Sequence, residues 1–286
     1  MHVSRARNLL GWLVAFLLAA SASLAEPFDK VWCLRFAVAP DAPLSAVLAG
    51  APRDATLDLP FAMCVARGPS QVVVLDSGFV NRKLGESYGV RDWVEYAPLL
   101  AEVGVTPDEV TTVTLSHLHF DHAGGTSRFP KAKFVVQRRE LEFAAAAMPH
   151  NSAARTAFVA EDVVSLVQLN WQGRVLLADG DVEDLVPGLD VYLTPGHTAG
   201  TMTVCLDTPK QRVCYSSDAV YTYRNLDEDI PLGLALDSFE AVESFKKIRR
   251  LLRGGVLIPG HEPRIFEKPE QFGFRRVSEH AIAVVE

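Results

Sequence analysis

The sequence has few cysteines, no excess of positive charge, no internal repeat and no low-complexity linker. Only 4 of its 286 residues are cysteine, and none lies at a metal-binding spacing from another, which disfavours a cysteine-based zinc module. Lys and Arg number 28 against 35 Asp and Glu, giving a formal charge of −7. Acidic chains of this kind bind nucleic acid poorly. We therefore expect no nucleic-acid partner.

The chain also lacks a hydrophobic run long enough to cross a membrane. Its most apolar stretch, Leu9–Ala20, has 12 residues, whereas a spanning helix needs roughly 20. Arg5 and Arg7 precede this run, and the small residues Ser23 and Ala25 follow it, three and one positions before a possible cleavage site. This pattern is typical of a secretory signal peptide. The alternative is an anchor that stays attached to the membrane.

We therefore expect residues 1–25 to be a signal peptide that is cleaved after Ala25. Residues 26–286 would then form a single domain without stable membrane insertion. The mature protein would be periplasmic or secreted, in an oxidising compartment.

Export bears on the state of the four cysteines. Cys205 and Cys214 flank a short turn and would lie opposite each other in a hairpin. Cys33 and Cys64 are the other candidates for a disulfide. The sequence leaves three full pairings open, as well as four buried thiols.

Strand-like and helix-like stretches alternate along the chain, which predicts a mixed α/β fold in which helices cover two β-layers. Helical spacing predicts Trp93–Val103 and Phe239–Leu252, and a helix start at Arg138–Met148. Apolar and β-branched runs predict strands at Val31–Val38, Phe61–Ala66, Gln71–Asp76, Val110–Leu115, Lys133–Gln137, Leu189–Thr194 and Val256–Pro259, and a hairpin at Thr201–Tyr215.

One stretch, TLSHLHFDHAGG at Thr114–Gly125, holds three of the chain's 8 histidines. It follows a predicted strand. In an extended chain His117, His119 and Asp121 would share a face, and His122 would follow where the chain turns. Imidazole and carboxylate groups gathered at the mouth of a sheet are suited to a divalent metal such as zinc.

Three further candidate ligands each follow an apolar run: His197 in TPGH, Asp218 in SSD, and His261 in PGH. Seven ligands fit two cations that share one carboxylate. Two cations roughly 3.5–4 Å apart can hold a water and lower its pKa toward neutrality, so this set predicts hydrolysis by a bridging hydroxide. Zinc is the expected metal, although such ligands also accept iron, cobalt or manganese.

In this order, SHLHFDHAGG, TPGHTAGT, SSDAVY and IPGHEP resemble the metallo-β-lactamase superfamily over residues 31–265, and are most similar to its N-acyl-homoserine lactonase subgroup. The resemblance implies an α/β fold, a four-layer αβ/βα sandwich with the metal site at one edge of the two sheets. It also implies that His117, His119 and His197 hold the first metal, that Asp121, His122 and His261 hold the second, that Asp218 bridges them, and that Asp76 supports the site.

Two residues are candidates for catalysis. Tyr221 lies three residues after Asp218, as in the lactonases that the chain resembles, and a phenol there could stabilise an oxyanion. Alternatively, Tyr221 is an ordinary core or surface aromatic. Tyr223 lies two residues further on and is the other tyrosine that could pack in the core. Asp121 is similar in place to a proton shuttle between the water and the leaving alkoxide.

The expected function is a quorum-quenching lactonase that opens N-acyl-homoserine lactones or a related small lactone or ester. A β-lactamase is disfavoured because the enzymes of that kind have Cys or Ser in place of Asp218. A glyoxalase II-like thioesterase is disfavoured because only 25 residues follow His261. A nuclease would need basic surface, and a non-catalytic metal-binding relative would have lost ligands. His150 and His280 are expected at the surface; acyl-chain preference and oligomeric state stay open.

Overall fold

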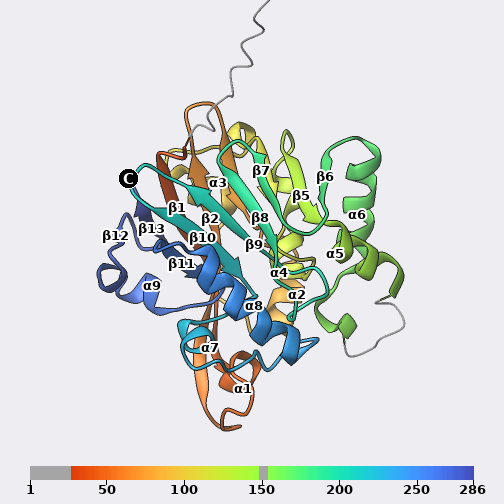
Figure 1. The fold of residues 1–286 in the computed structure, drawn as a ribbon, viewed down its shortest axis with the longest axis vertical. Coiled ribbons are helices and arrows are strands. Elements are labelled where there is room, and N and C mark those ends of the chain that lie inside the picture. Colours follow the sequence, from red (N-terminus) through yellow and green to blue (C-terminus); the bar gives the residue numbers. More distant parts are fainter. Residues whose placement is uncertain (1–26, 148–153) are drawn as a thin grey trace, which may run out of the picture.

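The computed structural model of the protein describes residues 27–147 and 154–286. The expected signal peptide and His150 lie outside these residues, so the domain boundary at residue 25 stays a prediction. Two β-sheets pack together, and helices lie outside them (Figure 1). Within the described ranges, no helix has the length and apolar character to cross a bilayer.

The first sheet has eight strands and carries the N-terminal half of the site. Its β1, β2 and β3 pair antiparallel, whereas β3 to β6 pair parallel. In spatial order the strands are β12 (Arg275–Arg276), β13 (Ala281–Val285), β1 (Lys30–Pro43), β2 (Thr56–Arg67), β3 (Val72–Leu75), β4 (Thr112–Thr114), β5 (Lys133–Gln137) and β6 (Val175–Ala178).

The second sheet has five strands and carries the C-terminal half. β10 and β11 are parallel, and the other neighbours are antiparallel. In spatial order the strands are β11 (Val256–Pro259), β10 (Arg212–Ser217), β9 (Met202–Asp207), β8 (Leu189–Leu193) and β7 (Val182–Val186).

Three hydrophobic clusters separate four layers and confirm the expected sandwich. One lies between the first sheet and helices α3 and α6, one between the two sheets, and one between the second sheet and α8. The helices are α1 (Leu44–Val47), α2 (Arg82–Ser87), α3 (Tyr96–Ala101), α4 (Phe120–Ala123), α5 (Arg138–Glu142), α6 (Ala160–Trp171), α7 (Tyr223–Asp227), α8 (Ser238–Leu251) and α9 (Arg264–Glu267).

Inner strands of the first sheet such as β3 and β5 are apolar on both faces because both faces are covered. In β5, Phe134 and Val136 pack toward the helices, and Val135 packs between the sheets. This is the two-residue period of a strand with two buried sides, and it explains why the sequence shows continuous apolar runs there.

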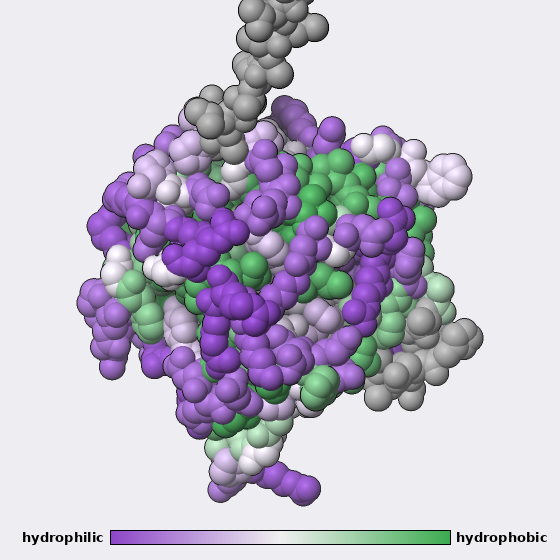
Figure 2. Space-filling view, viewed as in Figure 1, coloured by the Kyte–Doolittle hydropathy of each residue, from purple (hydrophilic) through white to green (hydrophobic). Residues whose placement is uncertain are grey.

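Helix α8 covers the outer face of the second sheet. Phe245 and Ile248 are fully buried against it, while Arg249 and Arg250 are exposed. Figure 2 shows that hydrophilic side chains cover this part of the surface. Arg249 and Arg250 therefore lie on the solvated side of an amphipathic helix.

The four cysteines form two disulfides. Cys33 and Cys64 pair across β1 and β2, between the sheets, and Cys205 and Cys214 pair across β9 and β10, beneath α8. Each pair occupies directly opposite positions of an antiparallel ladder. The expected hairpin therefore carries its cross-strand bond, and the alternative of four buried thiols is wrong for this structure.

Candidate metal centre

The candidate site lies at the edge where strands of both sheets end. β8 and β10 run in the same direction, because each is antiparallel to β9, and β11 runs parallel to β10. Their carboxyl ends therefore meet at one edge. The loop after β4 joins this edge, and the carbonyl of Ser116 accepts a hydrogen bond from the amide of Met202 at 2.9 Å. This bond ties the two sheets together beside the site.

All seven candidate ligands lie together at this edge, in two clusters. Within each cluster the ligand atoms lie within 4.8 Å of one another. The first cluster is His117, His119 and His197; the second cluster is Asp121, His122, Asp218 and His261.

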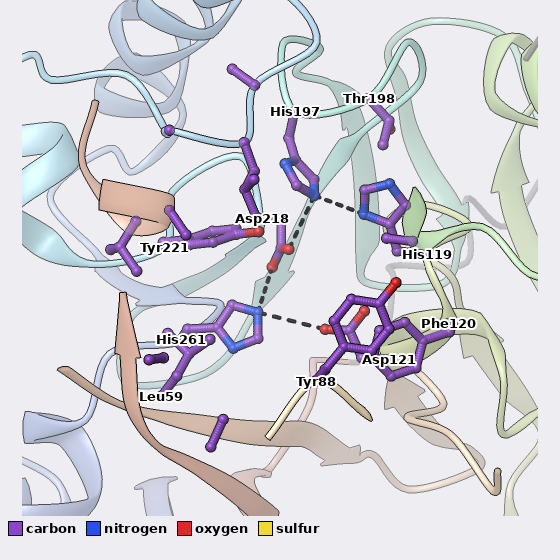
Figure 3. Close-up of a pocket in the computed structure, with 18 of the residues that line it drawn as sticks. Leu59, Tyr88, His119, Phe120, Asp121, His197, Thr198, Asp218, Tyr221 and His261 are labelled. Atoms are coloured by element: carbon purple, nitrogen blue, oxygen red, sulfur yellow. Dashed lines mark hydrogen bonds and ion pairs between the residues drawn. The ribbon is translucent and has the colours of Figure 1, made fainter. Parts of the chain in front are cut away.

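Asp218 faces both clusters, one carboxylate oxygen to each. Its Oδ2 lies 3.3 Å from His197 Nε2 and 3.7 Å from His117 Nε2. Its Oδ1 lies 3.3 Å from His122 Nε2 and 3.2 Å from His261 Nε2. Figure 3 shows Asp218 between the imidazoles of His197 and His261. This is the arrangement of a carboxylate that can bridge two cations.

The expectation that His117, His119 and Asp121 share one face of an extended chain is wrong. β4 ends at Thr114, and α4 begins at Phe120 with His119 as its N-cap. Helical geometry places Asp121 beside His122 in the second cluster, with Asp121 Oδ2 3.3 Å from His122 Nε2. The short α4 therefore divides the histidine-rich stretch between the two clusters.

Three histidines are oriented by hydrogen bonds at Nδ1, which turn Nε2 toward the centre. His122 Nδ1 lies 2.7 Å from Asp76 Oδ2, and His261 Nδ1 lies 2.8 Å from the Pro60 carbonyl. His117 Nδ1 lies 3.0 Å from the hydroxyl of its neighbour in sequence, Ser116. Such outer partners are typical of metal-binding histidines.

Asp76 is the main outer partner. Its side chain is fully buried, and its Oδ2 also accepts hydrogen bonds from Tyr215 and Ser217, both at 2.8 Å. Its Oδ1 accepts one from the amide of Ser116 at 2.7 Å. Asp76 has φ 62°, a left-handed conformation that is uncommon outside glycine and recurs at functional sites. Its place agrees with the supporting role that the resemblance implies.

Glu140 in α5 is a buried residue that the sequence reasoning missed. Its carboxylate accepts hydrogen bonds from the Leu118 amide at 3.0 Å, the Thr198 hydroxyl at 2.8 Å and the Gly200 amide at 2.7 Å. Burial raises the pKa of Glu140, and these hydrogen bonds partly oppose the rise. No motif marks it, because RRELE reads as an ordinary helix start.

The first cluster is electrically neutral. Burial, together with the neighbouring histidines, lowers the pKa of His117 well below its ordinary value. Burial and then His197 lower the pKa of His119 to about 3, and burial also lowers the pKa of His197. Three neutral imidazoles have lone pairs ready for a cation.

The second cluster has the opposite electrostatics. Burial acts to lower the pKa of His122, but Asp218, Asp121 and Asp76 outweigh it and raise that pKa well above its ordinary value. The same balance, led by Asp218, raises the pKa of His261. In turn, these histidines lower the pKa of Asp218 against the effect of its burial. The carboxylates therefore favour the protonated form of the two histidines in this cluster.

The polar atoms at the centre fit a pair of cations. His117 Nε2, His122 Nε2 and Asp218 Oδ1 are buried and make no hydrogen bond with suitable geometry among the described residues. Coordination of a divalent cation by imidazole and carboxylate would satisfy these atoms.

The two tyrosines that follow Asp218 lie in different places. Tyr221 lines the pocket, and its ring lies between those of His197 and His261, with centroids 5.4 and 4.9 Å away. Tyr223 instead stacks on Phe272 and donates a hydrogen bond to the Leu257 carbonyl at 2.8 Å. Of the two, Tyr223 is the packed aromatic.

A pocket of about 590 Å³ opens beside the clusters. Apolar side chains such as Leu59 and Phe158 form much of its wall, and Tyr88 stacks on Phe120 with ring centroids 4.8 Å apart. Among the described residues that line it, the acidic ones are Asp121 and Asp218, the histidines are His119, His197 and His261, and none is Lys or Arg.

Comparison with known proteins identifies the family. The model of the metallo-β-lactamase superfamily matches residues 59–261, a range that begins in β2 and ends at the last candidate ligand. The chain belongs to the metallo-β-lactamase superfamily. The N-acyl homoserine lactonase of Bacillus cereus is 32% identical over 155 residues, which are 54% of this chain and 56% of that protein. The chain thus matches little more than half the length of this curated relative.

Solved structures show the same fold. An N-acyl homoserine lactone hydrolase with N-hexanoyl-L-homoserine bound at its catalytic metal centre superposes with a TM-score of 0.69 at 22% identity, covering 86% of this chain and 96% of the other. AidC, a dizinc quorum-quenching lactonase, has a TM-score of 0.64 at 18% identity, covering 84% and 92%. These two likenesses agree on the fold.

Proposed function

We propose that this protein is a metal-dependent hydrolase that opens the ring of N-acyl homoserine lactones or of a related neutral lactone or ester. The observation that carries the proposal is the place of Asp218, which presents one oxygen to each of two histidine-containing clusters, beside the phenol of Tyr221. The relationship to N-acyl homoserine lactonases at 32% identity supports the substrate class.

The seven clustered side chains would hold two divalent cations. Three neutral imidazoles would bind the first, and Asp121, His122 and His261 would bind the second, with Asp218 shared. When bound, such a pair supplies Lewis acidity and a water of lowered pKa. Zinc is the metal we propose, and the dizinc lactonase of the same fold supports that choice.

Tyr221 would stabilise the negative charge that develops on the carbonyl oxygen. Burial, and then the charges of Asp218 and Asp121, raise the pKa of Tyr221 well above its ordinary value. The phenol therefore keeps its proton at neutral pH and can donate a hydrogen bond to an oxyanion. Its ring packs against one histidine of each cluster, which places it over the centre of the site.

Asp121 would carry the proton. Its carboxylate lines the pocket, 12% exposed, with Oδ2 3.3 Å from His122 Nε2. It can accept the proton that the attacking water loses and return it to the alkoxide that leaves the carbonyl carbon. In a lactone this alkoxide stays tethered, so the product is one hydroxy acid, which releases a proton at neutral pH.

The pocket favours a neutral substrate with apolar parts. β-Lactam antibiotics and glutathione thioesters carry carboxylates, which proteins usually bind with Arg or Lys. The described lining holds no such cation, and its apolar wall suits an acyl group. This disfavours both rival substrates and supports the lactone.

A substrate panel tests the proposal. The zinc-loaded protein should release acid from an N-acyl homoserine lactone, and should show weak or no turnover of a β-lactam or a glutathione thioester. Turnover of either rival without turnover of any lactone would overturn the substrate class. Full activity after verified removal of both metals would overturn the metal-dependent mechanism.

We propose export to the periplasm or the medium as a separate point. The two buried disulfides support it, because such bonds persist in oxidising compartments. Fractionation of cells that express the full sequence should place the protein outside the cytoplasm, with an N-terminus after Ala25. Recovery of the unprocessed chain in the cytoplasm would contradict this.

A further inference from the structure

Glu140 joins two loops, the first after β4 and the second between β8 and β9, through its two carboxylate oxygens. Its Oε1 accepts from the Leu118 amide at 3.0 Å, and its Oε2 accepts from both the Thr198 hydroxyl and the Gly200 amide. The side chain is fully buried. The backbones also meet closely, because a Cβ added to Gly200 would lie 2.4 Å from the Glu140 nitrogen. Glycine at 200 is what allows the second loop to reach α5.

The two loops are those that carry the first cluster. Leu118 lies between His117 and His119, and Thr198 directly follows His197. The second cluster is held elsewhere: Asp76 contacts His122, and the Pro60 carbonyl contacts His261. The hydrogen bonds of Glu140 therefore reach the two loops that carry every ligand of one cluster, through Leu118, Thr198 and Gly200.

We propose that Glu140 is a positioning residue that sets the affinity of the first cluster for its cation, by holding the loops of His117, His119 and His197 in register. The inference rests on the proposed function, which supplies the cation. Glu140 contacts no ligand atom and acts through two backbone amides and one hydroxyl of residues near the ligands. Residues that orient ligands in this way change metal affinity by about 10- to 100-fold when substituted.

The geometry makes the carboxylate hard to replace. All three partners are donors, so both oxygens must accept. Glutamine has the same shape but only one acceptor oxygen, and its NH2 group would face either the Leu118 amide or the donors of the other loop. A buried N–H would then lose its partner, and one loop would shift.

The test compares Glu140→Gln with Glu142→Gln, which makes the same change at an exposed position of the same helix. Zinc binding to metal-free protein is titrated against a chromophoric chelator, which yields two binding constants without any substrate. We expect Glu140→Gln to weaken one constant about 10- to 100-fold and to leave the other within about 2-fold. Glu142→Gln should change neither.

A double variant assigns the weakened constant to the first cluster. In a His197→Ala background, where that cluster already lacks a ligand, adding Glu140→Gln should leave the remaining high-affinity constant unchanged. If Glu140→Gln does not fold, Thr198→Val decides the question, because it removes one donor to Oε2 and should weaken the same constant by a smaller factor.

Two zinc constants equal to those of the unaltered protein in Glu140→Gln, or in Thr198→Val if the first variant does not fold, would overturn the inference. So would equal loss at both clusters, which would indicate general damage to the fold. Neither result depends on turnover. An unaltered protein that binds two zinc ions but opens no lactone would instead overturn the proposed function.

Discussion

The two clusters lie at one sheet edge and share Asp218, but they differ in charge and in support. The first has three imidazoles whose pKa values are lowered by burial, and Glu140 holds its loops. The second adds carboxylates, which raise the pKa values of its histidines, and Asp76 holds it by direct contact with His122. Protons therefore compete with a cation more strongly at the second cluster than at the first.

The two clusters show that the type of ligand does not by itself decide how strongly protons compete with a cation. Imidazole is common to both clusters, yet its protonation depends on whether carboxylates lie nearby. The shared carboxylate links the two. We therefore expect the two clusters to bind their cations with different pH dependence. We expect both to lose metal affinity to a similar extent only when Asp218 is substituted.

The largest effect should follow removal of the shared ligand. Asp218→Asn leaves one acceptor oxygen for two clusters, so kcat/KM for a lactone should fall roughly 10³-fold or more, about 4 kcal/mol in activation free energy. Elemental analysis should also show less than two metals per chain. Asp227→Asn, an exposed change in α7, is the control and should alter neither quantity. Two retained metals with normal turnover would break the link between the clusters.

Tyr221 contacts both clusters without belonging to either. Tyr221→Phe removes only the hydroxyl that would donate a hydrogen bond to the oxyanion. We therefore expect kcat to fall about 10²-fold, while the metal content and the two zinc-binding constants stay unchanged. Steady-state kinetics on the zinc-loaded protein checks this. Tyr223→Phe is the matched control, because its hydroxyl bonds the Leu257 carbonyl; it should affect stability more than kcat. Unchanged turnover in Tyr221→Phe would remove this phenol from the mechanism.

Asp76→Asn should mirror the Glu140 substitution at the other cluster. An amide in place of the carboxylate weakens the contact with His122 Nδ1, so zinc affinity of the second cluster should fall about 10- to 100-fold. The chelator titration measures it. Because Asp76 also bonds Ser116, next to His117, a smaller loss at the first cluster is expected. A larger loss there would reverse the assignment of supports.

The smallest effect concerns pH. His122 and His261 have raised pKa values, so protons compete with a cation at higher pH there and acidification should strip the second cluster first. The first cluster resists longer, since the pKa of His119 is lowered to about 3 and protons compete only at lower pH. Metal content after dialysis from pH 8 to pH 5 should fall from about two to about one before further loss. Loss of both metals in one step would contradict this.

Much of the fold could be predicted from local patterns. The strands at Lys133–Gln137 and Val256–Pro259 match their predicted bounds, because a buried strand between turn signals is marked by its apolar run. Helix α8 was marked by its apolar stripe and ends within one residue of its prediction. The helix predicted at Trp93–Val103 is shorter in the structure, where α3 spans Tyr96–Ala101, because helix ends depend on tertiary contacts more than on composition.

The site was predictable only in part. His117, His119 and His122 form a dense motif, and the downstream ligands stand at strand ends in order. The sequence did not show which ligands share a cluster. Helix α4 begins inside the motif, so its side chains repeat with the period of a helix there and not with the two-residue period of a strand. Glu140 was not readable at all, because its role arises from three hydrogen bonds to segments 22, 58 and 60 residues away.

By itself the sequence determined which residue types were present for metal chemistry and where strands would end, because both follow from local side-chain chemistry and periodicity. Only the tertiary structure decided that one Asp218 oxygen faces each cluster, and that Glu140 contacts the loops of the first. It also decided that burial lowers the pKa values of the histidines in one cluster, while carboxylates raise those of His122 and His261 in the other. These properties depend on distances between segments far apart in the chain, and folding alone sets those distances.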